Sequence, residues 1–164
     1  MRQLKARGLT LVELMVGLAI SALLALSAAP FFGDYIANSR LREAGNALYT
    51  ETLFAQSEAQ KRNARVQVNL TGSTIRTLDF SAGGAGELIR EFGLAAPVTV
   101  STNTSFDFGS NGRPLLAANG QPVDVAVNLV VTGSACTTER RCPGLRVDAG
   151  GAVRLCGDYV NACN

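Results

Sequence analysis

One acidic side chain, Glu13, lies near the start of an apolar run from Leu9 to Phe32 that carries no other formal charge. Placing an ionised side chain in membrane hydrocarbon costs roughly 2.5–3.5 kcal/mol on insertion scales. A carboxylate in that position needs a cationic partner once its segment is buried in a low-dielectric environment. The sequence therefore predicts that another group supplies a positive charge to Glu13.

The second set of side chains with specific chemistry consists of cysteines near the end of the chain: Cys136, Cys142, Cys156 and Cys163. An even number of cysteines is typical of disulfides formed in an oxidising compartment. Their spacing contains no Cys-x-x-Cys pair, and the chain has no histidine. A zinc site, or any other metal site, is therefore not expected.

The pairing of these cysteines depends on a final β-hairpin, which is expected around Asp148-Ala149-Gly150-Gly151. If the strand residues directly before and after this turn pair with each other, Cys142 comes nearly opposite Cys156. This register predicts the disulfides Cys142–Cys156 and Cys136–Cys163, the second of which would pin the C-terminus. Adjacent pairing, in which Cys136 joins Cys142 and Cys156 joins Cys163, is the alternative.

Four arginines lie among the cysteines and define a candidate nucleic-acid patch: Arg140, Arg141, Arg146 and Arg154. Non-specific DNA binding depends on clustered Lys and Arg that neutralise phosphates. The whole chain has a net charge of only +2, and residues 64–164 contain eight basic and eight acidic side chains. DNA binding is therefore not favoured, and an ordinary solvated surface is the simpler interpretation.

The composition gives no support for an enzyme. The chain lacks histidine, the usual general base, and its serines and aspartates follow no nucleophile-elbow or metal-binding spacing. The glycine-rich stretch 83–86 lacks the Lys-Ser/Thr of a phosphate-binding loop. No catalytic residue and no cofactor are expected.

The residues that could do chemistry are positioned by a long N-terminal helix. The 24 residues from Leu9 to Phe32 would extend roughly 36 Å as a helix, enough to cross a hydrocarbon core of about 30 Å. The octapeptide 1–8 has three basic residues and no acid, which predicts a cytoplasmic N-terminus and a C-terminal part on the far side of the membrane. Pro30 predicts a kink.

Two other interpretations of the apolar run are open. An ordinary secretory signal peptide could be cut after Ser27-Ala28-Ala29, which would release a secreted, disulfide-bonded binding domain. Pro30 directly after that cut, the length of the run and the charge of Glu13 all count against it. A simple membrane anchor with no further role is the other alternative.

Beyond the apolar run, residues 33–62 turn polar but keep helical periodicity. Apolar side chains at steps of three, four and seven residues form one stripe: Ala37, Leu41, Ala44, Leu48, Ala55 and Ala59. This stripe predicts a face that packs on a sheet, within a helix that runs from Thr10 to about Arg62. Such a helix is far longer than the mean of about 11–12 residues.

Residues 63–164 have the composition of a β-rich domain. A first hairpin is expected from Ala64–Leu70 and Ser73–Phe80, and a helical turn at Glu87–Phe92. Further strands are expected at Val98–Thr102, Ser105–Phe108, Val123–Thr132, Leu145–Val147 and Ala152–Leu155. The fold class is therefore α+β, with a long N-terminal helix packed on a mostly antiparallel sheet domain.

The N-terminus resembles the class III signal of type IV pilins and pseudopilins, because Arg7-Gly8 is followed by Leu-Thr-Leu-Val-Glu and an uninterrupted apolar helix. The resemblance implies that residues 1–8 are a leader. A prepilin peptidase would cut between Gly8 and Leu9 and methylate Leu9. Glu13 then becomes the fifth mature residue and pairs with the N-terminal amine of a neighbouring subunit. The first mature residue is Leu here, where the family usually has Phe.

The rest of the chain resembles the GspH/FimT branch more weakly, through Phe106-Asp107-Phe108, Gly112-Arg113 and the cysteine-flanked final hairpin. That branch implies a minor pilin or pseudopilin that helps to prime a type IV pilus or a type II secretion pseudopilus. In some members a Gly-Arg-x-Arg hairpin resembles a DNA-binding site for transformation. Gly151 to Arg154 matches it only in its last arginine.

The resemblance also implies where the protein acts and with what. The implied partners are other major and minor pilins or pseudopilins, the prepilin peptidase and the bacterial inner membrane. The protein would span that membrane once, with its C-terminal domain in the periplasm, before it enters a pilus or pseudopilus. A DNA-binding minor pilin for DNA uptake is the alternative function.

Overall fold

The computed structural model describes residues 10–116, 120–161 and 163, with the backbone alone for residues 28–31. Within them, one helix, α1 (Leu11–Arg62), precedes nine strands. The predicted helix from Thr10 to about Arg62 is therefore confirmed. Its first turn carries Glu13 and its last turn carries Lys61 and Arg62, charges that complement the helix dipole.

No single straight helix in the described part of the chain is both long and apolar enough to cross a membrane. The stretches Leu11–Ser27 and Phe32–Arg62 meet that criterion together, across a bend, by length and composition only. The bend lies in the interval that contains Pro30, where the sequence predicts a kink.

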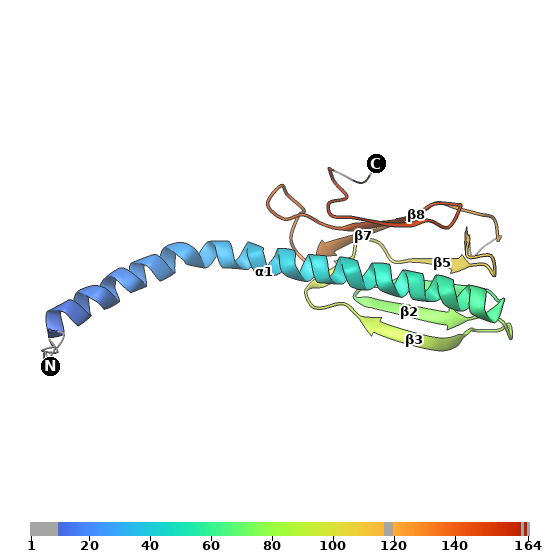
Figure 1. Ribbon diagram of the computed structural model, residues 1–164, viewed down its shortest axis with the longest axis horizontal. Helices are drawn as coiled ribbons and strands as arrows, with labels where there is room; N and C mark the ends of the chain where they lie inside the picture. The colour runs from blue at the N-terminus through green and yellow to red at the C-terminus, as the bar shows by residue number, and fades with distance from the viewer. Residues whose placement is uncertain (1–9, 117–119, 162, 164) are drawn as a thin grey trace, which may run out of the picture. The chain divides into compact units, whose positions relative to one another are not determined.

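The chain divides into two compact units, one that ends at Tyr35 and one that begins at Ile36. In the second unit, α1 runs along two antiparallel sheets, with β2 and β3 on one side and β7 and β8 on the other (Figure 1). The α+β prediction of a long helix packed on antiparallel sheets is thus confirmed. The predicted apolar stripe faces the sheets, because Leu41, Leu48 and Ala59 are fully buried.

The helix can lie close to the sheets because its buried face is rich in small residues. Ala44 and Ala55 are 2% and 0% exposed. At Gly45 a Cβ atom would lie only 3.0 Å from the Cβ of Pro143, so a larger residue would push the helix away. Each fully buried leucine on this face contributes about 1.5–3 kcal/mol relative to an exposed one.

The first sheet has the strand order β3-β2-β1-β5-β6. Its strands are β1 (Val66–Thr71), β2 (Thr74–Asp79), β3 (Glu87–Gly93), β5 (Thr104–Phe108) and β6 (Pro114–Leu115). The predicted first hairpin is confirmed as β1 and β2, which pair in register from Thr71–Thr74 to Val66–Asp79. On β5, Phe106 and Phe108 pack edge to face in the core, with ring centroids 5.5 Å apart.

The expected helical turn at Glu87–Phe92 is wrong, since these residues form the edge strand β3. The spacing of Leu88, Ile89 and Phe92 is also compatible with one helical turn. The open edge of β2 provides a better arrangement: Phe92 pairs with Ile75 and Leu88 with Leu78, around a β-bulge. Tertiary pairing has overridden the local preference.

The second sheet has the order β4-β7-β8-β9 and contains β4 (Val98–Val100), β7 (Val125–Val131), β8 (Gly144–Val147) and β9 (Val153–Cys156). These strands match the expected ones within a few residues. On β7, alternate residues are buried, so one face of the sheet packs on the helix side and the other faces outward. Leu145 and Leu155 pair on the inner face, where Leu155 lies beside Gly45 of the helix.

Candidate functional site

The predicted functional residues near the N-terminus are only partly within the described residues. Gly8 and Leu9, the predicted cleavage and methylation site, lie outside them. Glu13 is described and exposed in the first turn of α1. Among the described residues, its carboxylate has no cation within salt-bridge distance.

Glu13 instead forms a capping box with Thr10. The Thr10 hydroxyl accepts a hydrogen bond from the Glu13 backbone N–H at 3.2 Å. The Glu13 carboxylate accepts from the Thr10 N–H and hydroxyl, both at 3.4 Å. This reciprocal arrangement satisfies donors that a helix start leaves unpaired. The sequence signal for it, Thr-x-x-Glu before an apolar run, is present from Thr10 to Glu13.

The first half of α1 exposes a continuous set of large apolar side chains, which include Leu11, Met15, Leu18, Leu23 and Leu26 at 61–74% exposure. Soluble monomers rarely expose contiguous apolar patches larger than a few hundred Å². The exposure of this set indicates a segment that another apolar phase covers, either lipid or neighbouring helices.

The predicted disulfide pairing is wrong. The structure joins Cys136 to Cys142 and Cys156 to Cys163, with Cα–Cα distances of 5.7 and 5.5 Å, which is the adjacent alternative. In the final hairpin Cys156 lies opposite Gly144. Cys142 is therefore two residues beyond the end of the ladder, where the chain has already turned toward Cys136.

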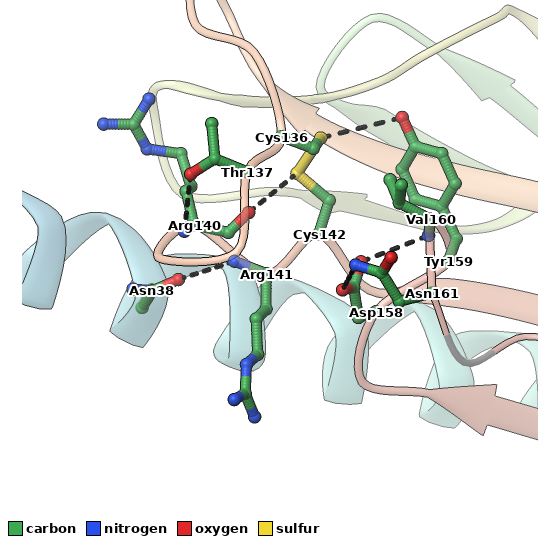
Figure 2. Close-up of a disulfide and its surroundings, with 10 residues drawn as sticks. All are labelled: Asn38, Cys136, Thr137, Arg140, Arg141, Cys142, Asp158, Tyr159, Val160 and Asn161. Atoms are coloured by element: carbon green, nitrogen blue, oxygen red, sulfur yellow. Dashed lines mark hydrogen bonds between the residues drawn. A yellow bond between two sulfur atoms is a disulfide. The ribbon is translucent and has the colours of Figure 1, made fainter.

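The Cys136–Cys142 disulfide closes a short loop against α1 (Figure 2). The side chain of Asn38 holds this loop from the helix: it donates to the carbonyl of Glu139 at 2.7 Å and accepts from the N–H of Arg141 at 3.1 Å. Thr137 adds a bond from within the loop, because its hydroxyl accepts from the N–H of Arg140 at 3.1 Å.

The C-terminal segment folds back over the same region. The N–H of Tyr159 donates to the carbonyl of Cys142 at 2.8 Å, and the Tyr159 hydroxyl lies 3.6 Å from the sulfur of Cys136 (Figure 2). Asp158 is buried and accepts from the N–H of Val160 and the amide of Asn161. Tyr159 therefore attaches the C-terminal segment to the Cys136–Cys142 disulfide.

The structure separates the four arginines of the predicted nucleic-acid patch into two pairs. Arg140 and Arg141 lie on the disulfide loop, and Figure 2 shows their side chains leaving it in different directions. Arg146 and Arg154 instead line a cavity of about 440 Å³ on the second sheet. Arg146 and Arg154 thus line one cavity together, and Arg140 and Arg141 are not among its lining residues.

This cavity, called the arginine groove below, lies on the outer face of β7, β8 and β9. Arg146 is directly opposite Arg154 in the β8–β9 ladder, and Ala126 is opposite Arg146 on the other side. Asp124 and Asp148 also line the groove, as does the disulfide between Cys156 and Cys163.

Both groove aspartates are engaged by the backbone of the β8–β9 turn. Asp124 accepts from the N–H of Ala149 at 2.7 Å, and Asp148 accepts from the N–H groups of Gly150 and Ala152 at 3.0 Å. The pKa of Asp148 is lowered, chiefly by its hydrogen bond from Ala152 and to a smaller extent by the positive charge of Arg154.

Two side chains of α1 that the sequence did not mark connect the helix to distant segments. Besides Asn38, Gln56 donates from its amide to the carbonyl oxygens of Gly112 and Gly151, both at 2.8 Å. Nothing in the sequence marks Asn38 or Gln56, because their partners lie 56 to 103 residues away. No cluster of three or more metal-ligating side chains occurs among the described residues.

Comparison with known families finds a match to the prokaryotic N-terminal methylation motif over residues 4–29. A search of curated protein sequences finds no significant match.

Solved structures of similar fold include those of a minor pilin and a minor pseudopilin. The type IV minor pilin FimU of Pseudomonas aeruginosa superposes with a TM-score of 0.56 at 17% identity, over 71% of this chain and 88% of that one. The minor pseudopilin EpsH of the Vibrio cholerae type II secretion system gives a TM-score of 0.57 at 10% identity, over 74% of this chain and 96% of that one. These similarities establish a shared fold.

Proposed function

We propose that this chain, which combines an N-terminal methylation motif with the fold of minor pilins and pseudopilins, is a minor pilin or pseudopilin. It is a structural subunit that joins other pilin-like subunits at the tip of a pilus or secretion pseudopilus and helps to prime assembly. The observation that carries this proposal is the coincidence of the motif, with Glu13 inside it, and the exposed apolar half of α1 in one segment.

The proposed installation begins at the membrane. The apolar half of α1 inserts with the basic leader on the cytoplasmic side. A prepilin peptidase then hydrolyses the peptide bond between Gly8 and Leu9 and methylates the new amine. Leu9 thereby gains a positive charge only four residues before Glu13.

Assembly is proposed to give the Glu13 carboxylate a cationic partner. In the isolated chain its carboxylate has only weak, exposed bonds of 3.4 Å to Thr10. When the helices of several subunits pack together, the carboxylate leaves water and gains from a salt bridge to a neighbouring N-terminal amine. Such a buried pair fixes the axial register of adjacent helices, as single polar groups do in coiled coils.

The second unit would serve as the displayed part of the subunit. In this unit, side chains of α1 form hydrogen bonds or ion pairs with both sheets and with the disulfide loop. A force on α1 is therefore passed to the whole domain. The protein is proposed to reside first in the bacterial inner membrane, with this domain in the periplasm, and afterwards in the filament. The divided arginines and the balanced charge give no support for DNA uptake as its role.

Mass spectrometry of the mature N-terminus tests the proposal. The protein, purified from cells with a prepilin peptidase, is expected to begin at Leu9 and to carry one methyl group. A parallel sample from cells that lack the peptidase should retain residues 1–8. A mature N-terminus at Pro30 would overturn the proposal in favour of an ordinary signal peptide.

A further inference from the structure

The arginine groove holds two like charges side by side on one face of a sheet. Arg146 and Arg154 are a directly opposed pair in the β8–β9 ladder. Opposed side chains in antiparallel strands have Cβ atoms about 4.5–5.5 Å apart, and like charges at that spacing are destabilising. Among the described residues, neither arginine forms a salt bridge that would offset this repulsion.

Arg146 is held in place by neutral acceptors. Its Nη1 atom donates to the side-chain oxygen of Asn128 at 2.8 Å and to the carbonyl of Leu145 at 2.9 Å. The side chain is half-buried, so its guanidinium is fixed before any ligand arrives. These bonds all use Nη1, which leaves the donors of Nε and Nη2 for a ligand.

Among the described residues, the aspartates of the groove form no salt bridge with its arginines, although the positive charge of Arg154 acts on Asp148. Asp124 and Asp148 each accept hydrogen bonds through Oδ1 from backbone N–H groups of the β8–β9 turn. Both aspartates line the groove, and the disulfide between Cys156 and Cys163 borders it too. A single carboxylate would meet less repulsion from these two aspartates than an extended polyanion, because it carries one negative charge instead of many.

The dimensions agree with a small ligand group. The volume of about 440 Å³ lies in the lower part of the range of roughly 300–1,000 Å³ that is typical of ligand pockets. A planar carboxylate matches the fork of guanidinium donors, and charge-assisted bonds of this kind are roughly twice as strong as neutral ones. The exposed Arg154 can adjust to the ligand, while Arg146 remains fixed.

We propose that the arginine groove binds a single carboxylate of a neighbouring pilin-like subunit, from an acidic side chain or a chain terminus, between Arg146 and Arg154. This inference rests on the proposed function, because it supplies a contact between displayed domains in addition to the one at Glu13. The bound carboxylate removes the repulsion between the two arginines, so the contact stabilises the hairpin as well as the filament.

Nitrogen-15 NMR of the full-length protein in detergent micelles tests the groove through the Nε–H signals of its arginines. The probe is the peptide acetyl-Gly-Glu-Gly-amide, and its matched control is acetyl-Gly-Gln-Gly-amide. We expect saturable shifts at Arg146 and Arg154 with the Glu peptide and at least a tenfold weaker response to the Gln peptide. Arg154→Gln should abolish the response, whereas Arg113→Gln, an exposed arginine outside the groove, should retain it.

Three outcomes would overturn the proposal. Equal responses to the two peptides would mean that the carboxylate is not recognised, and absence of saturable shifts would mean that the groove does not bind it. Tighter binding of a single-stranded oligonucleotide than of the Glu peptide would identify phosphate as the ligand and a nucleic acid as the partner. The mature N-terminus is measured separately. A chain that begins at Leu9 but does not bind the Glu peptide would therefore refute the carboxylate site and leave the proposed function intact.

Discussion

The guanidinium of Arg62, in the last turn of α1, lies 2.8 Å from the carboxylate of Asp79 at the end of β2. The same guanidinium is 2.8 Å from the carboxylate of Glu58, one turn earlier. Both acidic groups are largely buried, so Arg62 connects the helix to the first sheet through two charges shielded from water.

This network predicts that acid destabilises the domain. The pKa of Glu58 is lowered, mainly by its hydrogen bond from Arg62. The pKa of Asp79 is lowered mainly by the Ser81 backbone N–H and, to a smaller extent, by Arg62. A group with a lowered folded pKa contributes stability above its unfolded pKa and loses it as the pH falls through the folded value. The thermal midpoint should therefore decline as the pH falls from above 4.5 to below 3.8.

The variant Asp79→Asn separates this contribution from those of other carboxylates. It removes one titrating group, so its midpoint should be lower than that of the parent at pH 7 and should fall less on acidification. Scanning calorimetry at several pH values measures both effects. If the parent and the variant decline in parallel, Asp79 does not contribute to the acid sensitivity.

Removal of the Gln56 side chain should loosen the attachment of α1 to two turns of the sheets. Gln56→Ala leaves the carbonyls of Gly112 and Gly151 without this donor. We expect a loss of about 1–3 kcal/mol in the free energy of unfolding, measured by urea titration. Ser57→Ala is the matched control, since Ser57 is exposed and bonds only within its helix, and it should change stability by no more than about 0.5 kcal/mol.

A side chain at Gly151 should be strongly destabilising. Its φ of +97° lies in the region that favours glycine, and a Cβ atom would lie 2.6 Å from the carbonyl oxygen of Gly112. Gly151→Ala should therefore cost more than the roughly 1–2 kcal/mol of a left-handed backbone alone. At Gly157 a Cβ would meet nothing within 4 Å, so Gly157→Ala should be neutral or mildly stabilising in the same urea titration. Equal effects at the two sites would contradict the turn geometry.

Tryptic mapping without reduction should distinguish the two disulfide pairings. Trypsin cuts after Arg141, Arg146 and Arg154, which separates Cys142 from Cys156. With the observed pairing, the C-terminal peptide from residue 155 to residue 164 is released alone, with an internal disulfide. With Cys142–Cys156 and Cys136–Cys163 it would instead remain linked to both other cysteine peptides.

Removal of the Glu13 charge should impair assembly without affecting insertion. Glu13→Gln preserves the shape of the capping box and should still insert and be cut at Gly8. Its incorporation into filaments should fall about tenfold, which corresponds to about 1.4 kcal/mol. Fractionation of cells and of sheared filaments measures both steps.

A matched variant separates the charge from the cap. Thr10→Val removes the hydroxyl that accepts from the Glu13 N–H but keeps the carboxylate. It should assemble better than Glu13→Gln. The reverse order would show that the helix start, and not the charge, controls incorporation.

Local features of the sequence were sufficient for the N-terminal methylation motif and for much of the secondary structure. The periodicity of the stripe that contains Leu41 and Leu48 predicted the buried face of α1, because helical spacing alone determines which side chains share a face. The short runs Ala64–Leu70 and Ser73–Phe80 likewise predicted the β1–β2 hairpin, in which the partner strand is the next one along the chain.

The tertiary structure decided the features that depend on distant partners. Residues Glu87–Gly93 became a strand because β2 offered an open edge, and Asn38 fixed a loop about 100 residues away. The disulfides and the arginine groove depend on the register of β8 and β9, in which a slip of one residue moves a side chain to the other face. The sequence supplied Arg146 and Arg154, but only the folded ladder placed them side by side.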